Sequence, residues 1–75
     1  MHTSRNANRI VVERPTDTVI VEIMYDKNTN KYCFVNLTKS HVCECRFNTY
    51  EDALVDLENQ KREGKVLEWW YFHLD

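Results

Sequence analysis

Glycine and proline are almost absent from this sequence, which has one residue of each, Gly64 and Pro15, in 75 residues. A chain with one glycine has no glycine-rich loop of the kind that cradles phosphate groups, so we expect no nucleotide-binding motif. No run approaches the roughly 18 consecutive apolar residues of a membrane-spanning helix, so we expect no membrane contact. Residues 1–9 lack the apolar segment of a signal peptide. We also find no internal repeat and no catalytic motif.

Cysteine is scarce too, and the three cysteines, Cys33, Cys43 and Cys45, are a poor framework for disulfides because their number is odd. We therefore expect reduced thiols and a cytoplasmic protein. His41 alternates with two of these cysteines along one predicted strand, and such side chains are the ligands that zinc prefers. Neighbouring same-face positions on a flat strand are roughly 7 Å apart, however, so we predict no metal and no cofactor. The same spacing is poor for a Cys–His nucleophile, and we predict that the protein is not an enzyme.

The composition is that of a folded chain, because 43% of the residues are hydrophobic and 29% are charged. A chain this short buries about 60% of its unfolded surface, which suffices for one sheet and one helix. We therefore predict a flexible tail over residues 1–8 and a single α+β domain over residues 9–75. The net charge of −2 divides into +2 over residues 1–43 and −4 over residues 44–75. This balance argues against the wide basic surface that non-specific DNA binding requires.

Residues 48–64 carry every local signal of an α-helix. Asn48 and Thr49 are both good N-cap residues, and each is followed three residues later by an acidic side chain, the spacing of a capping box. Gly64 stands where a left-handed C-cap is favoured. Between these ends runs an apolar stripe at helical spacing, which consists of Tyr50, Ala53, Leu54 and Leu57. The stripe predicts that one face of this helix packs on a sheet.

Alternating, β-branched segments predict the strands. Residues 18–25 and 31–37 form a hairpin, residues 41–47 form a third strand, and residues 65–74 form the last one. Residues 9–13 are a candidate for one more strand. The β-β-β-α-β order predicts an α+β fold: a three- to four-stranded antiparallel, partly mixed sheet with one helix packed on one face. A right-handed crossover through the helix predicts that the last strand lies beside the first strand, residues 18–25, and parallel to it.

A three-residue loop at residues 38–40 predicts the register of the second and third strands. It pairs Leu37 with His41, and since side chains alternate, it sorts the two strands into two faces. The predicted face under the helix consists of Cys33, Val35, Leu37, Cys43, Cys45 and Phe47. The predicted uncovered face shows Tyr32, Phe34, Asn36, Val42, Glu44 and Arg46.

Three surfaces carry more aromatic or charged side chains than folding requires. The predicted partner-binding residues are Tyr32, Phe34 and Arg46 on the uncovered sheet face, Trp69 and Tyr71 on the last strand, and Val55 on the helix. Trp and Tyr are enriched at interfaces because they combine a large area with a polar tip. The aromatic last strand has two other uses, as core beneath a folded-over N-terminal segment and as a homodimer interface. The acidic side of the helix is a further surface, suited to a basic partner.

The strand-strand-strand-helix order and the string FNTYEDA at residues 47–53 resemble the plant AP2 domain and the arm-binding domains of tyrosine recombinases. The resemblance spans residues 18–63 and implies a three-stranded sheet that reads DNA. Aromatic side chains beside basic groups on such a sheet can stack on single-stranded bases. The predicted face departs from a basic surface, since it carries Glu22 and Glu44, and Arg46 is its one strong phosphate ligand.

Together these features predict a small protein-binding module, a regulator or an inhibitor that acts by protein–protein contact. Chains of this size and kind are often encoded by phages and mobile elements. The alternative is a nucleic-acid-binding domain that uses the uncovered sheet face. A homodimer is compatible with both.

Overall fold

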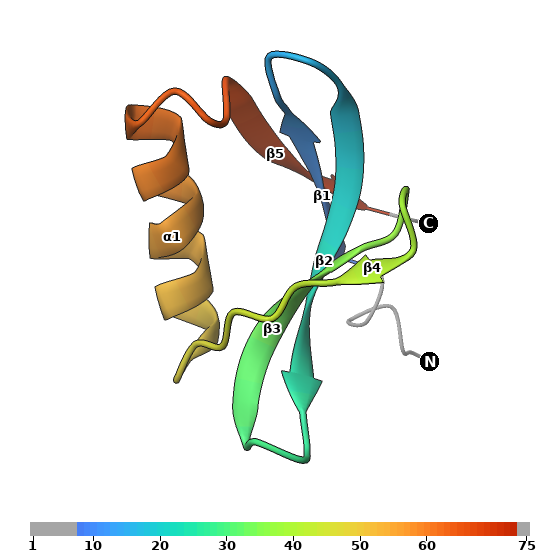
Figure 1. Cartoon of the computed structure of the whole chain (residues 1–75), viewed down its shortest axis with the longest axis vertical. Helices are drawn as coiled ribbons and strands as arrows, with labels where there is room; N and C mark the ends of the chain where they lie inside the picture. The colour runs from blue at the N-terminus through green and yellow to red at the C-terminus, as the bar shows by residue number, and fades with distance from the viewer. Residues whose placement is uncertain (1–7, 74–75) are drawn as a thin grey trace.

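The computed structural model describes residues 8–73, which form one antiparallel sheet and one helix (Figure 1). The elements are β1 (Asn8–Glu13), β2 (Thr18–Asp26), β3 (Lys31–Asn36), β4 (His41–Val42), α1 (Tyr50–Arg62) and β5 (Glu68–His73). The five strands lie in the order β4-β3-β2-β1-β5. The predicted α+β class, with one helix on an antiparallel sheet, is confirmed. The sheet has five strands because the candidate segment at residues 9–13 does form a strand. Of the predicted tail, residues 1–7 lie outside the described residues and Asn8 already belongs to β1.

The last strand, β5, runs in the same direction as β2, the first strand of the predicted hairpin, but β1 lies between the two and pairs antiparallel with each, so the predicted place directly beside that first strand is wrong. β1 and β2 form a tight hairpin, in which the backbone N–H of Arg14 donates to the carbonyl oxygen of Asp17 at 2.8 Å. The chain leaves α1 close to that turn, where the N–H of Leu67 donates to the carbonyl of Glu13 at 2.7 Å. From there β5 returns along the free edge of β1, with Glu68 opposite Glu13 and Phe72 opposite Arg9.

The helix begins and ends at the caps that the sequence predicts. The hydroxyl oxygen of Thr49 accepts a hydrogen bond from the N–H of Asp52 at 3.0 Å, so Thr49 is the N-cap. Gly64 has a φ of 83°, the left-handed conformation that glycine adopts at no steric cost. Two backbone hydrogen bonds close the C-terminus of the helix. The N–H of Gly64 donates to the carbonyl oxygen of Lys61 at 3.1 Å, and the N–H of Lys65 donates to the carbonyl oxygen of Gln60 at 2.9 Å. This is the Schellman arrangement.

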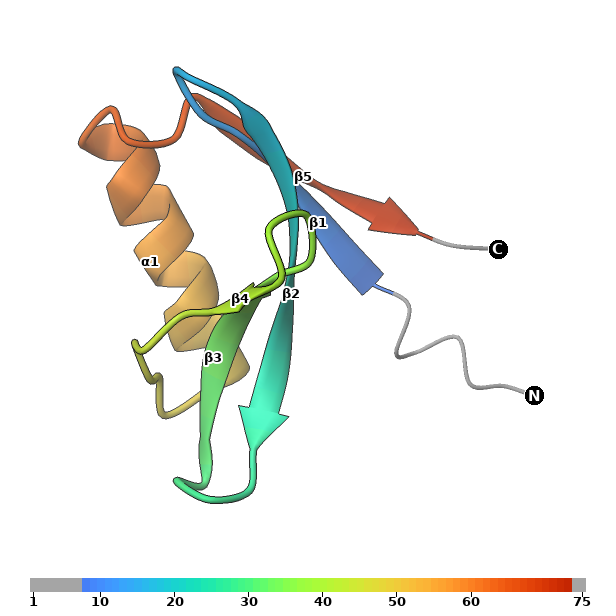
Figure 2. The ribbon, with the colours of Figure 1, turned by 45° about the vertical axis from the view of Figure 1, so that its right-hand side comes forward.

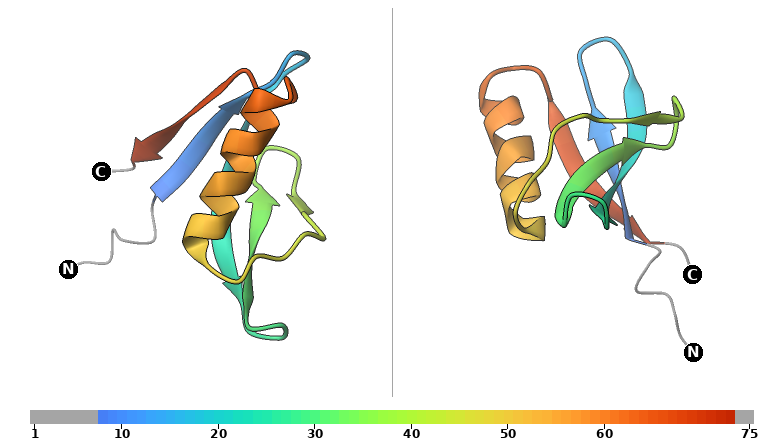
Figure 3. Two further views of the ribbon diagram at one scale, coloured as in Figure 1. Left: turned by 90° about the vertical axis from the view of Figure 1, so that its left-hand side faces the viewer. Right: turned by 60° about the horizontal axis from the view of Figure 1, so that its bottom comes forward.

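The helix α1 covers one face of the sheet, as Figures 2 and 3 show, and the core lies between the two. The strands contribute Ile10, Val12, Val19, Val21, Ile23 and Phe34, and α1 with the loop after it contributes Ala53, Leu57 and Val66. Every one of these side chains is buried. Tyr50 and Leu54, the other members of the predicted stripe, are half-buried against this cluster.

The predicted register between β3 and β4 is wrong by one residue, and the two faces of β3 are therefore exchanged. The loop has four residues, Leu37 to Ser40, and it pairs Asn36 with His41. Phe34 consequently points under the helix with 8% of its surface exposed, and its ring meets Phe47 at 5.4 Å. β4 ends after two residues, so the chain from residue 43 to residue 46 leaves the sheet as a loop.

Leu57 provides a test of this packing, because its side chain is 3% exposed between α1 and the sheet. We expect Leu57→Ala to lower the free energy of unfolding by about 2–4 kcal/mol, since it removes buried methyl groups and enlarges the space beneath α1. Val55 is 55% exposed on the same helix, so Val55→Ala is the control and should change stability by less than about 0.5 kcal/mol. Urea denaturation measures both. Equal losses in the two variants would contradict the described helix orientation.

Candidate functional site

One face of the sheet has no helix or strand of residues 8–73 over it, and we call it the open face (Figure 2). Alternation along the paired strands places the following apolar side chains there: Val11, Ile20, Met24, Val35, Val42, Trp70 and Phe72. Trp70 is 47% exposed and Phe72 is 42% exposed. The open face therefore carries apolar side chains on all five strands, with a polar row of Glu68, Glu13 and Thr18 at one end, and its largest apolar side chains lie on β5.

A single ion pair lies among these apolar side chains. Arg9 on β1 stands between Phe72 on β5 and Glu22 on β2, as the strand registers require. The Nε atom of Arg9 is 3.5 Å from Oε1 of Glu22, and the Glu22 side chain is 15% exposed. The pair places two opposite charges on the open face, on the neighbouring strands β1 and β2.

The other side of β5 is tied to α1 by polar contacts. The indole N–H of Trp69 donates to Glu58 at 2.7 Å, and the hydroxyls of Tyr50 and Tyr71 lie 3.2 Å apart. Burial, with a smaller contribution from the Tyr71 hydrogen bond, raises the pKa of Tyr50 well above its usual value. Since β5 alternates, these contacts on the helix side leave Trp70 and Phe72 on the open face.

The predicted binding residues Tyr32, Phe34 and Arg46 do not share the open face. Tyr32 is half-buried on the helix side, with ring contacts to Tyr25 at 5.3 Å and to Tyr50 at 6.3 Å. Phe34 belongs to the core. The predicted exposure of Tyr32 and Phe34 is wrong because the loop before β4 has four residues, which changes the register and exchanges the two faces of β3.

Arg46 fastens the loop that follows β4. Its Nε donates to Asp26 at 3.1 Å, and its Nη1 donates to the carbonyls of Cys43 and Cys45 at 2.7 Å and 2.8 Å. The guanidinium thus has structural partners on both the β2 end and the loop.

The remaining predicted residues are not gathered into one site either. Trp69 and Tyr71 adjoin each other on the helix side of β5, with ring centroids 6.0 Å apart. Val55 is exposed on α1, which covers the side of the sheet opposite to the open face (Figure 3). Sequence reasoning missed Trp70 and Phe72. The alternation of the last strand carried the necessary signal, but choosing its open side required the pairing with β1.

Cys43 and Cys45 form a disulfide, so the expectation of reduced thiols is wrong for this pair. The loop brings their Cα atoms to 5.4 Å, within the usual range for a disulfide, which the predicted flat strand would not have done. Cys33 is a buried free thiol. In the part of the chain that the structure describes, no three His, Cys, Asp or Glu side chains are placed to hold a metal ion. No helix of residues 8–73 is long and apolar enough to cross a membrane.

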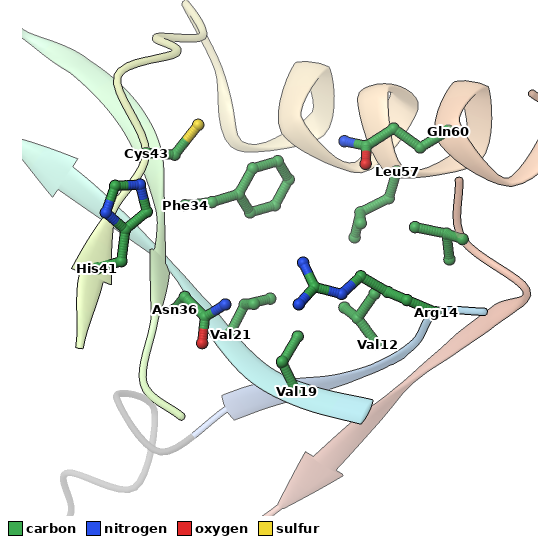
Figure 4. Close-up of a pocket in the computed structure, with 11 residues that line it drawn as sticks. Val12, Arg14, Val19, Val21, Phe34, Asn36, His41, Cys43, Leu57 and Gln60 are labelled. Atoms are coloured by element: carbon green, nitrogen blue, oxygen red, sulfur yellow. The ribbon is translucent and has the colours of Figure 1, made fainter. Parts of the chain in front are cut away.

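A pocket of about 210 Å³ lies on the helix side, between α1 and the sheet (Figure 4). Its apolar lining is Val12, Val19, Val21, Phe34, Leu57 and Val66, and its other lining residues are Arg14, Asn36, His41, Cys43 and Gln60. The pocket and the open face are on opposite sides of the sheet.

The Asp26–Arg46 contact predicts a pH dependence. The N–H of Asn28, and then Thr29 and the Arg46 guanidinium, hold the pKa of Asp26 below its usual value. A carboxyl with a lowered folded-state pKa stabilises the fold fully above its unfolded-state pKa of about 3.9, and this stabilisation is lost as the pH falls through the lower value. Asp26→Asn should therefore reduce the fall in melting temperature on acidification, which thermal denaturation across this pH range measures.

The contribution of Arg46 to the lowered pKa of Asp26 is checked by an NMR titration of the Asp26 carboxyl carbon. We expect the pKa to move back towards its usual value in Arg46→Gln, since one of the groups that stabilise the carboxylate is then gone. An Asp26 that titrates at the usual value in the unmodified protein would contradict the contact.

Two features, the open face and the pocket beneath α1, are thus the candidate sites on this fold. Comparison of the chain with protein-family models, with curated proteins and with solved structures finds no match in any of the three.

Proposed function

We propose that this chain is a small, non-enzymatic protein-binding module that recognises an apolar patch on a partner protein through its open face. The observation that carries the proposal is the exposure of Trp70 and Phe72 beside the apolar side chains of β1, β2 and β3. Scattered exposed apolar residues are normal, whereas a contiguous apolar area marks an interaction surface.

Trp70, on the edge strand β5, is the main anchor of the proposed interface. It forms one cross-strand row with Val11 and Ile20, and Phe72 begins the next row with Arg9 and Glu22. Tryptophan dominates binding energy where apolar neighbours exclude water around it. The Arg9–Glu22 pair supports a preferred orientation of the partner, because a misplaced charge opposite either residue would be penalised.

The size of the open face favours a small interface. Four strands of six to nine residues and the two-residue β4, about 4.8 Å apart, span at most roughly 24 Å by 20 Å, an area near the lower limit of specific protein–protein interfaces. Such interfaces are typical of transient contacts. A regulator or an inhibitor that occupies part of its partner's surface fits this size, and we infer that role for the chain.

The test of this proposal replaces Trp70. We expect Trp70→Thr to weaken capture of the partner at least tenfold, because the substitution removes the largest apolar area of the open face and keeps a residue that favours strands. The measurement is quantitative affinity capture with the tagged full chain, after nuclease treatment. Val55→Thr is the control, since Val55 is similarly exposed, at 55% against 47% for Trp70, but lies on α1.

Three outcomes would overturn the proposal. The first is retention of the partner by Trp70→Thr, and the second is an equal loss in Val55→Thr. The third is binding that disappears with nuclease and falls steeply with salt, which would identify a nucleic acid as the partner. Circular dichroism and thermal denaturation establish that the two variants remain folded.

A further inference from the structure

The pocket beneath α1 has a gradient of polarity from its depth to its rim. Its six apolar lining residues are all buried, with exposed fractions of 8% or less. The polar lining residues are more accessible: Arg14, Asn36 and Gln60 are half-buried, and His41 is exposed. Figure 4 shows Asn36 and His41 on the β3–β4 side and Arg14 reaching across between the sheet and α1. A gradient of this kind suits a ligand with an apolar body and one polar end.

The size of the pocket limits that body to about one ring. An engineered apolar cavity of about 150 Å³ in another protein binds benzene. The pocket here, at about 210 Å³, has room for such a ring and a short substituent. The ring of Phe34 and the branched side chains of Val12, Val21 and Leu57 are suitable walls for an aromatic ring.

The charge near the rim favours an anion at the polar end. Arg14 donates from Nε and Nη2 to Asp17 at 2.6 Å and 2.7 Å, which uses two of the five N–H groups of the guanidinium. Lys39 lies 3.5 Å from the same carboxylate, so two cations face one anion. The pocket lining itself includes no acidic side chain. Asp56, which bonds to the rim residue Gln60, offsets Lys39, but Arg14 is the one permanently charged side chain of the lining, and three of its N–H groups remain for a ligand.

The amides of the rim add further donors. The Oδ1 atom of Asn36 accepts from the N–H of Lys39 at 3.0 Å, which orients this amide and leaves its NH₂ group available. Gln60 donates one N–H to Asp56 at 2.7 Å and retains the other. Donors thus outnumber acceptors at the rim, which suits a carboxylate.

We propose that the pocket beneath α1 binds a small aromatic carboxylate, with its ring among the buried apolar side chains and its carboxylate beside Arg14 and Asn36. This binding site is independent of the proposed protein-binding function, because the pocket and the open face lie on opposite sides of the sheet. Either one can be disproved without the other.

The experiment titrates the full chain with phenylacetate and follows backbone amide signals by NMR. We expect saturable shifts with a dissociation constant on the order of 1 mM, as for a ligand of about ten non-hydrogen atoms. The shifts should be largest around Val12, Val21, Phe34 and Leu57. Phenylacetamide, which keeps the ring and lacks the charge, should bind at least fivefold more weakly. Acetate alone should give no saturable shift.

A charge placed at the rim tests the position of the carboxylate. His41→Glu should weaken phenylacetate binding at least fivefold, because His41 is exposed at the rim and the new carboxylate repels the ligand. Asn28→Glu makes the same change of charge in the exposed hairpin between β2 and β3 and should leave the affinity unchanged.

The proposal is overturned by any of four results: no saturable shift with phenylacetate, equal affinity for phenylacetamide, equal effects of the two glutamate variants, or shifts centred on Trp70 and Phe72. The last of these would place the ligand on the open face. The amide spectra also report whether each variant is folded, so a loss of binding can be separated from a loss of structure.

Discussion

The organisation of this protein follows from the packing of a single helix, within residues 8–73, on a sheet of five strands. One helix of 13 residues, about 20 Å long, packs against a sheet of five strands that is about 24 Å wide. A helix has one apolar stripe and can cover one face of a sheet. The core therefore lies on that side, and the apolar residues that alternate to the other side of β1, β2 and β5 have no helix or strand of residues 8–73 over them. The open face is a direct consequence of this imbalance.

The helix was predictable because all of its determinants are local. The cap at Thr49, the buried pair Ala53 and Leu57, and the left-handed Gly64 are read from residues within one or two turns of each other. The α+β class was predictable for a related reason, since alternation along each strand depends on the strand itself. Neither inference needed to know which segments pair.

Pairing was where sequence reasoning failed, and the reason is physical. Both faces of β3 are apolar, so burial alone does not decide between Phe34 and Val35. The decision depends on whether the following loop has three or four residues, and Leu37 is acceptable both as the end of a strand and as the start of a turn. One residue of difference exchanges the two faces. Tyr32 and Phe34 were misplaced through this one ambiguity, whereas Arg46 was misplaced because the predicted strand of residues 41–47 ends after Val42 and continues as a loop.

The last strand shows how the two sides of the sheet constrain each other. Hydrogen bonds from Trp69 to Glu58 and between Tyr71 and Tyr50 hold β5 against α1. Because successive side chains of a strand point in opposite directions, these contacts also determine where Trp70 and Phe72 point. The helix thus shapes the open face without touching it. The prediction that function lies in the aromatic last strand remains the basis of our proposal, but its residues are those that the helix does not hold.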